Sequence, residues 1–237
     1  MIKLFVIRRL TEKVFFMTST RLVTSFNALS EQKKQALSWH KQGQLVQAQQ
    51  AYQTILHQHP QELSVWHLLG ILYQQQGNFD AALACCQQVL AVQPESLAVL
   101  SLAGVIAGQL ERHAEAISYF DQAIMLQKND VASHYNRAIA CNKCQRYQEA
   151  LLSLNVVIQQ QNNHAEAFNL RGTVLSNLKH YEDALANYQH ALAVKADYPV
   201  ALYHCGVVLE KLKRYFRLNL SEAHGLHRHF YQAPEFV

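Results

Sequence analysis

The chain has little of what an all-β or a membrane-spanning protein needs. Its 237 residues include only 8 glycines and 4 prolines, too few for a sheet protein that turns about every ten residues. No apolar run reaches the roughly 18 residues of a transmembrane helix. Hydrophobic residues make up 50% and charged residues 16%, so the chain can bury a core and is not a disordered tail. Ala, Leu and Gln dominate, and these residues favour helices.

The excess of positive charge is confined to one end of the chain. Residues 1–28 carry five basic residues and one acidic residue, whereas the remainder carries 16 of each sign. A neutral body has no net field to attract phosphate backbones, so we expect no nucleic-acid partner. The apolar pieces Leu4–Ile7 and Val14–Met17 are too short for a secretory signal. We favour an upstream extension with the true start at Met17 over the alternative, a short basic membrane-surface anchor.

The five cysteines are an odd number, and their spacing does not resemble a secreted disulfide framework. We therefore expect reduced thiols in a cytoplasmic protein. Cys141 and Cys144 are three residues apart and would share a helix face, but zinc needs two further ligands and no second pair lies nearby. We expect structural thiols and no metal. The tail histidines His224, His227 and His229 are likewise expected to be solvated.

A 34-residue period organises most of the chain. At one position of the period every residue is small, and at another most are aromatic: Ala48, Ala82, Ala116, Ala150 and Ala184 form the first set, and Phe79, Tyr147, Tyr181 and Tyr215 belong to the second. Five blocks follow without insertion or deletion, over 29–62, 63–96, 97–130, 131–164 and 165–198, and a partial block covers 199–215. Such a period is the mark of a repeat architecture.

Each block is predicted to hold two helices. In the second block, apolar residues fall at helical spacing on both sides of Gly77 and Asn78, a turn signal that would end the first helix. Pro94 stands where the second helix must end. We expect Gly70 and Ala82 to face each other where the two helices cross, because a bulky side chain there would hold the axes apart.

These recurring residues resemble the signature of the tetratricopeptide repeat family over residues 29 to about 215. The resemblance implies an all-α fold, a right-handed solenoid of antiparallel helix pairs that is stable only by stacking. It also implies a concave groove, lined by the first helix of each pair, that holds an extended or helical peptide. We therefore expect a protein-interaction scaffold with a protein or peptide partner. Phosphate loops, nucleophile elbows and paired carboxylates are absent from the sequence, so we expect no enzyme and no cofactor.

Certain positions on the first helix point into the groove in this family. By that resemblance the groove residues of this chain are largely apolar with neutral polar neighbours, which suits an apolar or amphipathic peptide. They are Leu37, Leu68, Ile71, Leu102, Val105, Tyr135, Asn136, Ile139, Asn169, Leu170, Thr173 and Tyr203. The alternative is that part of this set packs between neighbouring helices as core.

Two subgroups of the family can be compared by position. Chaperone-binding members clamp a carboxylate with groove asparagines, but Leu37 and Leu68 stand in those positions here, so we reject that subgroup. The residue pattern of the repeats also resembles that of bacterial O-linked N-acetylglucosamine transferase-like proteins, in which a row of asparagines, the asparagine ladder, runs along the groove. Only Asn136 occupies the ladder row, and Asn169 lies one residue away. The alternative function is thus a substrate-recruiting arm of such a glycosyltransferase, either truncated or acting with a separate catalytic chain.

Both ends depart from the repeat. Residues 1–28 form a basic extension and residues 216–237 an atypical tail, in which Phe216–Leu220 replaces the expected acidic and alanine pattern. A solenoid needs a polar outer face on its last helix. Either the tail caps the array or the chain is a fragment of a longer protein, and we favour the fragment.

Overall fold

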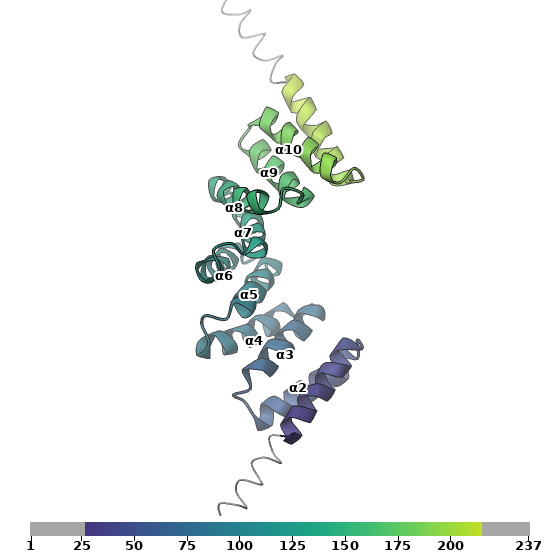
Figure 1. The fold of residues 1–237 in the computed structure, drawn as a ribbon, viewed down its shortest axis with the longest axis vertical. Helices are drawn as coiled ribbons and strands as arrows, with labels where there is room; N and C mark the ends of the chain where they lie inside the picture. Colours follow the sequence, from purple (N-terminus) through teal and green to yellow (C-terminus); the bar gives the residue numbers. More distant parts are fainter. Residues whose placement is uncertain (1–26, 215–237) are drawn as a thin grey trace, which may run out of the picture. The chain divides into compact units, whose positions relative to one another are not determined.

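A computed structural model describes residues 27–214, and every regular element within that range is a helix. The labelled helices (Figure 1) are α2 Leu45–Gln58, α3 Leu63–Gln75, α4 Phe79–Val92, α5 Leu97–Gln109, α6 His113–Leu126, α7 Val131–Lys143, α8 Tyr147–Gln160, α9 Ala165–Asn177 and α10 Tyr181–Val194. Helical segments 27–41 and 199–214 precede and follow them. Within 27–214 no helix is both long and apolar enough to span a bilayer. Most of the predicted N-terminal extension and the whole predicted tail, 216–237, lie outside the described residues.

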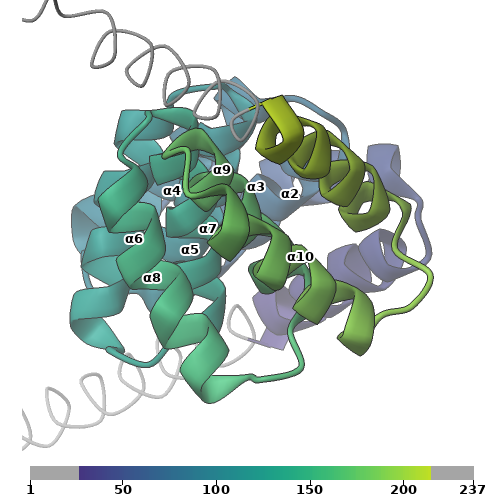
Figure 2. The ribbon, with the colours of Figure 1, turned by 90° about the horizontal axis from the view of Figure 1, so that it is seen from above.

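The helices belong to two units. Unit 1 reaches Ile106 and unit 2 begins at Ala107, so the boundary falls within α5. In unit 1, α2 packs on α3 and α3 packs on α4. In unit 2, each helix from α6 to α9 packs on the next one, and α7 also touches α9. Figure 2 gives a second view in which α9 and α10 lie side by side. Adjacent helices in sequence are therefore adjacent in space within each unit.

The turn predicted at Gly77 and Asn78 is confirmed, because α3 ends at Gln75 and α4 begins at Phe79. Gly43 and Gly77 both have φ of 75°, in the left-handed region that glycine adopts without penalty. The three later turns place non-glycine residues at the same repeat position: Glu111, Gln145 and Lys179 have φ of 59°, 59° and 65°. The repeat thus requires this backbone geometry even where the residue type does not favour it.

Polar side chains satisfy the free amide groups at several helix starts. The Ala81 amide donates to Asn78 Oδ1 at 3.3 Å, and the Ser133 amide donates to Asp130 Oδ2 at 2.8 Å. These are the bonds expected of N-cap residues. At the end of the pair formed by α3 and α4, helix α4 ends at Val92, two residues before Pro94, as predicted.

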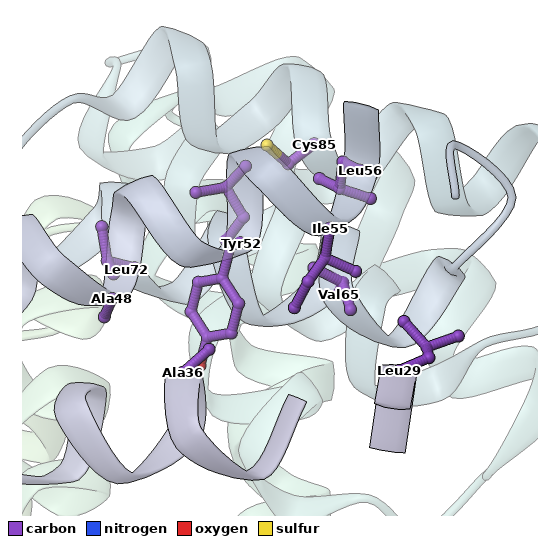
Figure 3. Close-up of a cluster of buried hydrophobic side chains, with 10 residues drawn as sticks. Leu29, Ala36, Ala48, Tyr52, Ile55, Leu56, Val65, Leu72 and Cys85 are labelled. Atoms are coloured by element: carbon purple, nitrogen blue, oxygen red, sulfur yellow. The ribbon is translucent and has the colours of Figure 1, made fainter. Parts of the chain in front are cut away.

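A core cluster of unit 1 contains Tyr52, which is fully buried (Figure 3). Its hydroxyl lies 3.2 Å from His40 Nδ1, which gives the buried phenol a polar partner. The predicted approach of Gly70 to Ala82 is confirmed: a Cβ on Gly70 would lie 3.4 Å from the Ala82 carbonyl oxygen and 3.3 Å from Cys85 Cβ. A side chain larger than that of alanine at position 70 would therefore push α3 and α4 apart.

A core cluster of unit 2 surrounds Tyr188, which is only 2% exposed. Tyr188 packs with buried Leu175, Ala184 and other apolar side chains of α9, α10 and segment 199–214. Its ring fills the space over Gly172, where an added Cβ would lie 2.7 Å from Tyr188 Cε1. Glycine at position 172 is thus required by the close approach of an aromatic ring.

Candidate functional site: the face formed by the first helices

In unit 2 the first helices of successive repeats are joined by polar side chains. Asn177 Nδ2 donates to Asn142 Oδ1 at 3.3 Å, and His204 Nδ1 lies 3.0 Å from Asn169 Oδ1. A third pair, Lys211 Nζ and Ser176 Oγ, is 3.5 Å apart. Each pair is separated by 35 residues. Helices α7, α9 and segment 199–214 therefore stand in a row with defined lateral contacts.

Seven of the predicted groove residues lie on this row, and we call them the unit 2 face: Tyr135, Asn136, Ile139, Asn169, Leu170, Thr173 and Tyr203. None is buried; Ile139 is 36% exposed, Tyr203 is 69% exposed and the others are half-buried. Thr173 Oγ1 donates to the Asn169 carbonyl oxygen at 3.0 Å and lies 3.3 Å from Tyr188 Oη. The face therefore combines exposed apolar groups with amide and hydroxyl groups that are held in place.

The remaining predicted groove residues belong to unit 1, and all are half-buried: Leu37, Leu68, Ile71, Leu102 and Val105. Leu68 packs against the buried cluster of this unit, so it also takes the core role that was the alternative. Segment 27–41 is tied to α3 by His40 Nε2 and Gln75 Oε1, 3.0 Å apart. Lys33 Nζ donates to Glu62 Oε2 at 2.7 Å, just before α3.

The predicted groove residues include only one of the polar side chains that bridge the first helices, Asn169. The other bridging pairs, His40 with Gln75, Asn142 with Asn177 and Ser176 with Lys211, lie outside the predicted set. A signal was present: polar residues recur at a spacing of 35, one more than the repeat. A residue on one first helix therefore meets the residue 35 positions further on, one beyond its repeat equivalent, because successive first helices are offset from each other.

Burial favours the uncharged forms of Tyr135, on the unit 2 face, and of the neighbouring His204. Desolvation, with smaller effects from Tyr198 and Glu166, raises the pKa of Tyr135 to about 12. Burial lowers the pKa of His204 from its usual value near 6.5. The Tyr135 ring packs 4.9 Å from the ring of His164, centroid to centroid. The face thus offers neutral aromatic and polar groups at these positions.

A different part of α7 carries a charged network. Arg137 Nε donates to Asp121 Oδ1 at 2.5 Å, Nη2 to Glu149 Oε2 at 2.9 Å and Nη1 to Ser153 Oγ at 2.9 Å. Arg146 holds the same Glu149 carboxylate with bonds of 2.6 and 2.7 Å, and this pairing lowers the pKa of Glu149. Burial opposes the charge of Arg137, but its acidic partners hold its pKa above the ordinary value. The guanidinium therefore ties α6, α7 and α8 together.

The thiols of the described residues are mostly buried in cores. Burial raises the pKa of Cys85 to about 11 and that of Cys86 to about 12, and it raises the pKa of Cys141. Protonated thiols are poor nucleophiles and poor metal ligands. Cys85 is 3% exposed and lies against Gly70. Within 27–214, no group of three or more His, Cys, Asp and Glu side chains is placed to hold a metal ion; the tail histidines lie outside that range.

Comparison with known families agrees with this helix arrangement. Three family models, each described as a tetratricopeptide repeat, match residues 34–62, 61–129 and 165–198. The chain is built of tetratricopeptide repeats. The predicted fold class, an all-α solenoid of antiparallel helix pairs, is thereby confirmed. No curated protein matches the chain.

Several solved structures share the fold at low sequence identity. YrrB, described as a tetratricopeptide repeat protein with an unusual peptide-binding site, is 21% identical with a TM-score of 0.67; the match covers 71% of this chain and 87% of YrrB. MamA is 15% identical with a TM-score of 0.68, covering 71% and 92% of the two chains. A tetratricopeptide repeat protein from Parabacteroides merdae is 12% identical with a TM-score of 0.72, covering 80% and 75%. These likenesses establish the fold.

Proposed function

We propose that the protein is an interaction scaffold that binds a peptide segment of a partner protein along the unit 2 face. The observation that carries the proposal is the row of α7, α9 and segment 199–214, joined by side-chain pairs 35 residues apart. Such a row presents several helices to one extended ligand. The peptide-binding site named for YrrB supports the same use of this fold.

The chemistry of the face favours an apolar or amphipathic peptide. Ile139, Leu170 and Tyr203 supply exposed or half-exposed apolar surface, and Asn136 supplies an amide that can both donate to and accept from a peptide backbone. The neutral state of Tyr135 and His204 adds no charge to select an acidic or a basic ligand. Affinity on this face would come from apolar burial and hydrogen bonds to the peptide backbone.

Two exposed positions allow a test that does not disturb the core. The double variant Ile139→Glu, Tyr203→Glu places two charges on the face, and Met125→Glu, on α6 of the same unit and 79% exposed, is the matched control. Proteins captured from a lysate of the source organism by the unmodified chain are identified, and the bound segment is synthesised. We expect calorimetry to show at least about tenfold weaker binding of that segment by the double variant, corresponding to roughly 1.4 kcal/mol.

The control variant should bind the segment as the unmodified chain does. Equal affinity of all three proteins, with equal helical circular dichroism, would place peptide binding elsewhere. The further expectations of a cytoplasmic, non-catalytic protein stay predictions.

The glycosyltransferase-arm alternative also stays a prediction, since none of the matches described above is named as a glycosyltransferase. Sequencing the coding region downstream in all frames tests it. A continuing repeat followed by a nucleotide-sugar-binding domain would favour the arm over the free-standing scaffold.

A further inference from the structure

Unit 1 contains a pocket on a different side of α3 from the predicted groove residues. It has a volume of about 480 Å³ and lies between α2, α3 and α4. On α3 the pocket uses Trp66, Leu69 and Tyr73, whereas the predicted groove uses Leu68 and Ile71. We call it the α2–α4 pocket; its lining residues are Gln53, Leu56, His57, Trp66, Leu69, Tyr73, Ala81, Ala84, Cys85 and Gln88.

The walls of the pocket are held by specific contacts. Trp66 Nε1 donates to the Pro60 carbonyl oxygen at 2.8 Å, which orients the indole. Gln53 Nε2 donates to Tyr73 Oη at 2.9 Å, which links α2 to α3 across the pocket. Leu69 and Cys85 are each 3% exposed, and Ala84 on α4 is too small to fill the space between them and α2. The pocket is therefore a built hollow with two oriented aromatic side chains.

The corresponding space in unit 2 is occupied by the chain itself. Sixty-eight residues further on, the positions of Leu69, Gln53, Ala81 and Cys85 are taken by Arg137, Asp121, Glu149 and Ser153, in that order. Those four are the residues joined by the Arg137 hydrogen bonds described above. The guanidinium thus reaches from α7 to both flanking second helices, α6 and α8. The equivalent residue of unit 1, Leu69, has a shorter side chain that leaves this space open.

The backbone arrangement around Leu69 in unit 1 and around Arg137 in unit 2 is the same. Trp66 corresponds to His134, whose Nε2 lies 2.9 Å from the Lys128 carbonyl oxygen, and Lys128 corresponds to Pro60. The equivalent ring nitrogen therefore bonds to the equivalent carbonyl in both units. The difference between pocket and network follows from the side chains that line the space.

We propose that the α2–α4 pocket binds a neutral aromatic side chain of a partner polypeptide, at a surface separate from the first-helix face. Its volume lies within the range of about 300–1,000 Å³ that is usual for ligand sites. Trp66 and Tyr73 can pack against a flat ring, and Gln53 and Gln88 can hydrogen-bond a phenol or an indole N–H.

The charge of the lining sets the preference for a neutral group. Asp121 and Glu149, which hold the cation in unit 2, are replaced by Gln53 and Ala81 in unit 1. No Asp, Glu, Lys or Arg lines the α2–α4 pocket. A cationic or an anionic ligand would lose hydration there without gaining an ion pair, so a neutral ring is favoured over both.

Two tryptophans make the pocket directly observable in the full chain labelled with ¹⁵N. N-acetyl-tyrosine amide serves as the probe, and the indole N–H signal of Trp66 is followed by NMR. We expect a saturable shift at Trp66. Trp39, which does not line the pocket, should stay unchanged and acts as an internal reference. The charged analogues 4-methylbenzylamine and 4-methylbenzoate should bind at least about tenfold more weakly than 4-methylphenol.

A single substitution at the pocket lining, Ala84→Leu, is expected to narrow the pocket. Ala84→Leu introduces the residue that unit 2 carries at the corresponding position, Leu152, and we expect it to weaken probe binding at least about tenfold. Ala186→Leu is the matched control, because Ala186 occupies the same repeat position and is also exposed. A second variant, Gln53→Asp, Leu69→Arg, Ala81→Glu, transplants the unit 2 network and should abolish the Trp66 shift. If it does not fold, Ala84→Leu still decides the question.

Three outcomes would overturn the proposal. Absence of a saturable Trp66 shift would exclude binding of an aromatic side chain. Equal binding of the charged analogues would contradict the preference for a neutral ring. If 4-methylphenol binds but N-acetyl-tyrosine amide does not, the pocket would be assigned to a free small molecule instead of a polypeptide.

Discussion

Residues 53–88 of unit 1 and 121–156 of unit 2 occupy equivalent positions two repeats apart. In the first stretch, Leu69 leaves an open pocket walled by aromatic rings. In the second, Arg137 reaches two carboxylates and a hydroxyl. One backbone frame therefore supports either a space for an outside group or a closed charged network.

This contrast shows that the frame of a repeat and its surface chemistry are set by different positions. The small and aromatic positions fix how helices stack, and they recur in both units. The positions between successive second helices tolerate Leu or Arg, Ala or Glu, and Cys or Ser. Packing density constrains the first group, whereas the second group lines the space between successive second helices and differs as a set between the two units.

The largest expected difference between the units concerns one repeat position occupied by glycine in both. Gly172→Ala should lower the free energy of unfolding by about 1–3 kcal/mol through overpacking, because its Cβ would lie 2.7 Å from the Tyr188 ring. Gly70→Ala should be nearly neutral: its Cβ meets Cys85 at 3.3 Å, and alanine is the better helix former. Urea denaturation followed by circular dichroism compares the two; equal losses would contradict the difference in packing.

The second prediction makes unit 2 resemble unit 1. Arg137→Leu removes a half-buried guanidinium and its hydrogen bonds to three residues. We therefore expect the free energy of unfolding to fall by about 1–2 kcal/mol, a modest loss because both carboxylates are partly exposed. Arg146→Leu breaks only a surface pair with Glu149 and should cost less than about 1 kcal/mol. Melting temperatures of the two variants test the ranking, and a larger loss for Arg146→Leu would refute it.

The third prediction concerns the turns, which use glycine in unit 1 and other residues in unit 2. Lys179→Gly should raise stability by about 0.5–1 kcal/mol, since Lys179 has φ of 65° and glycine removes that penalty. Gly77→Ala, at φ of 75°, should lower it by about 1 kcal/mol for the same reason. If the melting temperatures of both variants change in the same direction, the stability differences do not arise from the positive φ of these residues.

The smallest expected effect is a pH dependence in unit 2. Burial lowers the pKa of His204, so the unfolded chain binds its proton more readily than the folded chain. The stability contributed by neutral His204 is present above the unfolded pKa of about 6.5 and is lost as the pH falls through the lower folded value. His204→Gln should show a smaller decline in melting temperature between pH 7 and pH 5. An unchanged decline would remove His204 as its source.

Much of the fold follows from the period of the sequence. The turn at Gly77, the end of α4 before Pro94 and the close approach of Gly70 to Ala82 were all predicted from residue types at fixed spacing. These features are local or involve the two helices of one pair, which the 34-residue period relates directly. Assignment of the predicted groove residues to a binding role stays a prediction.

Most side-chain contacts between helices, within a repeat as well as between repeats, could not be predicted in the same way. The partners of Arg137 lie 16 and 12 residues away on different helices, and the pairs between first helices are 35 residues apart. Burial of Cys85 beside Cys86 likewise depends on where α3 lies. Each depends on the offset between neighbouring helices, which the period alone does not specify.

The sequence by itself determined the helix pairs, their turns and the small positions at which paired helices cross, because spacing along the chain and backbone preference are local properties. Only the tertiary structure decided which side chains meet between helices. It showed that a leucine at one position leaves a pocket of about 480 Å³, whereas an arginine at the equivalent position binds two carboxylates. The reason is geometric: the length and charge of a side chain matter only once the neighbouring helices define the space it enters.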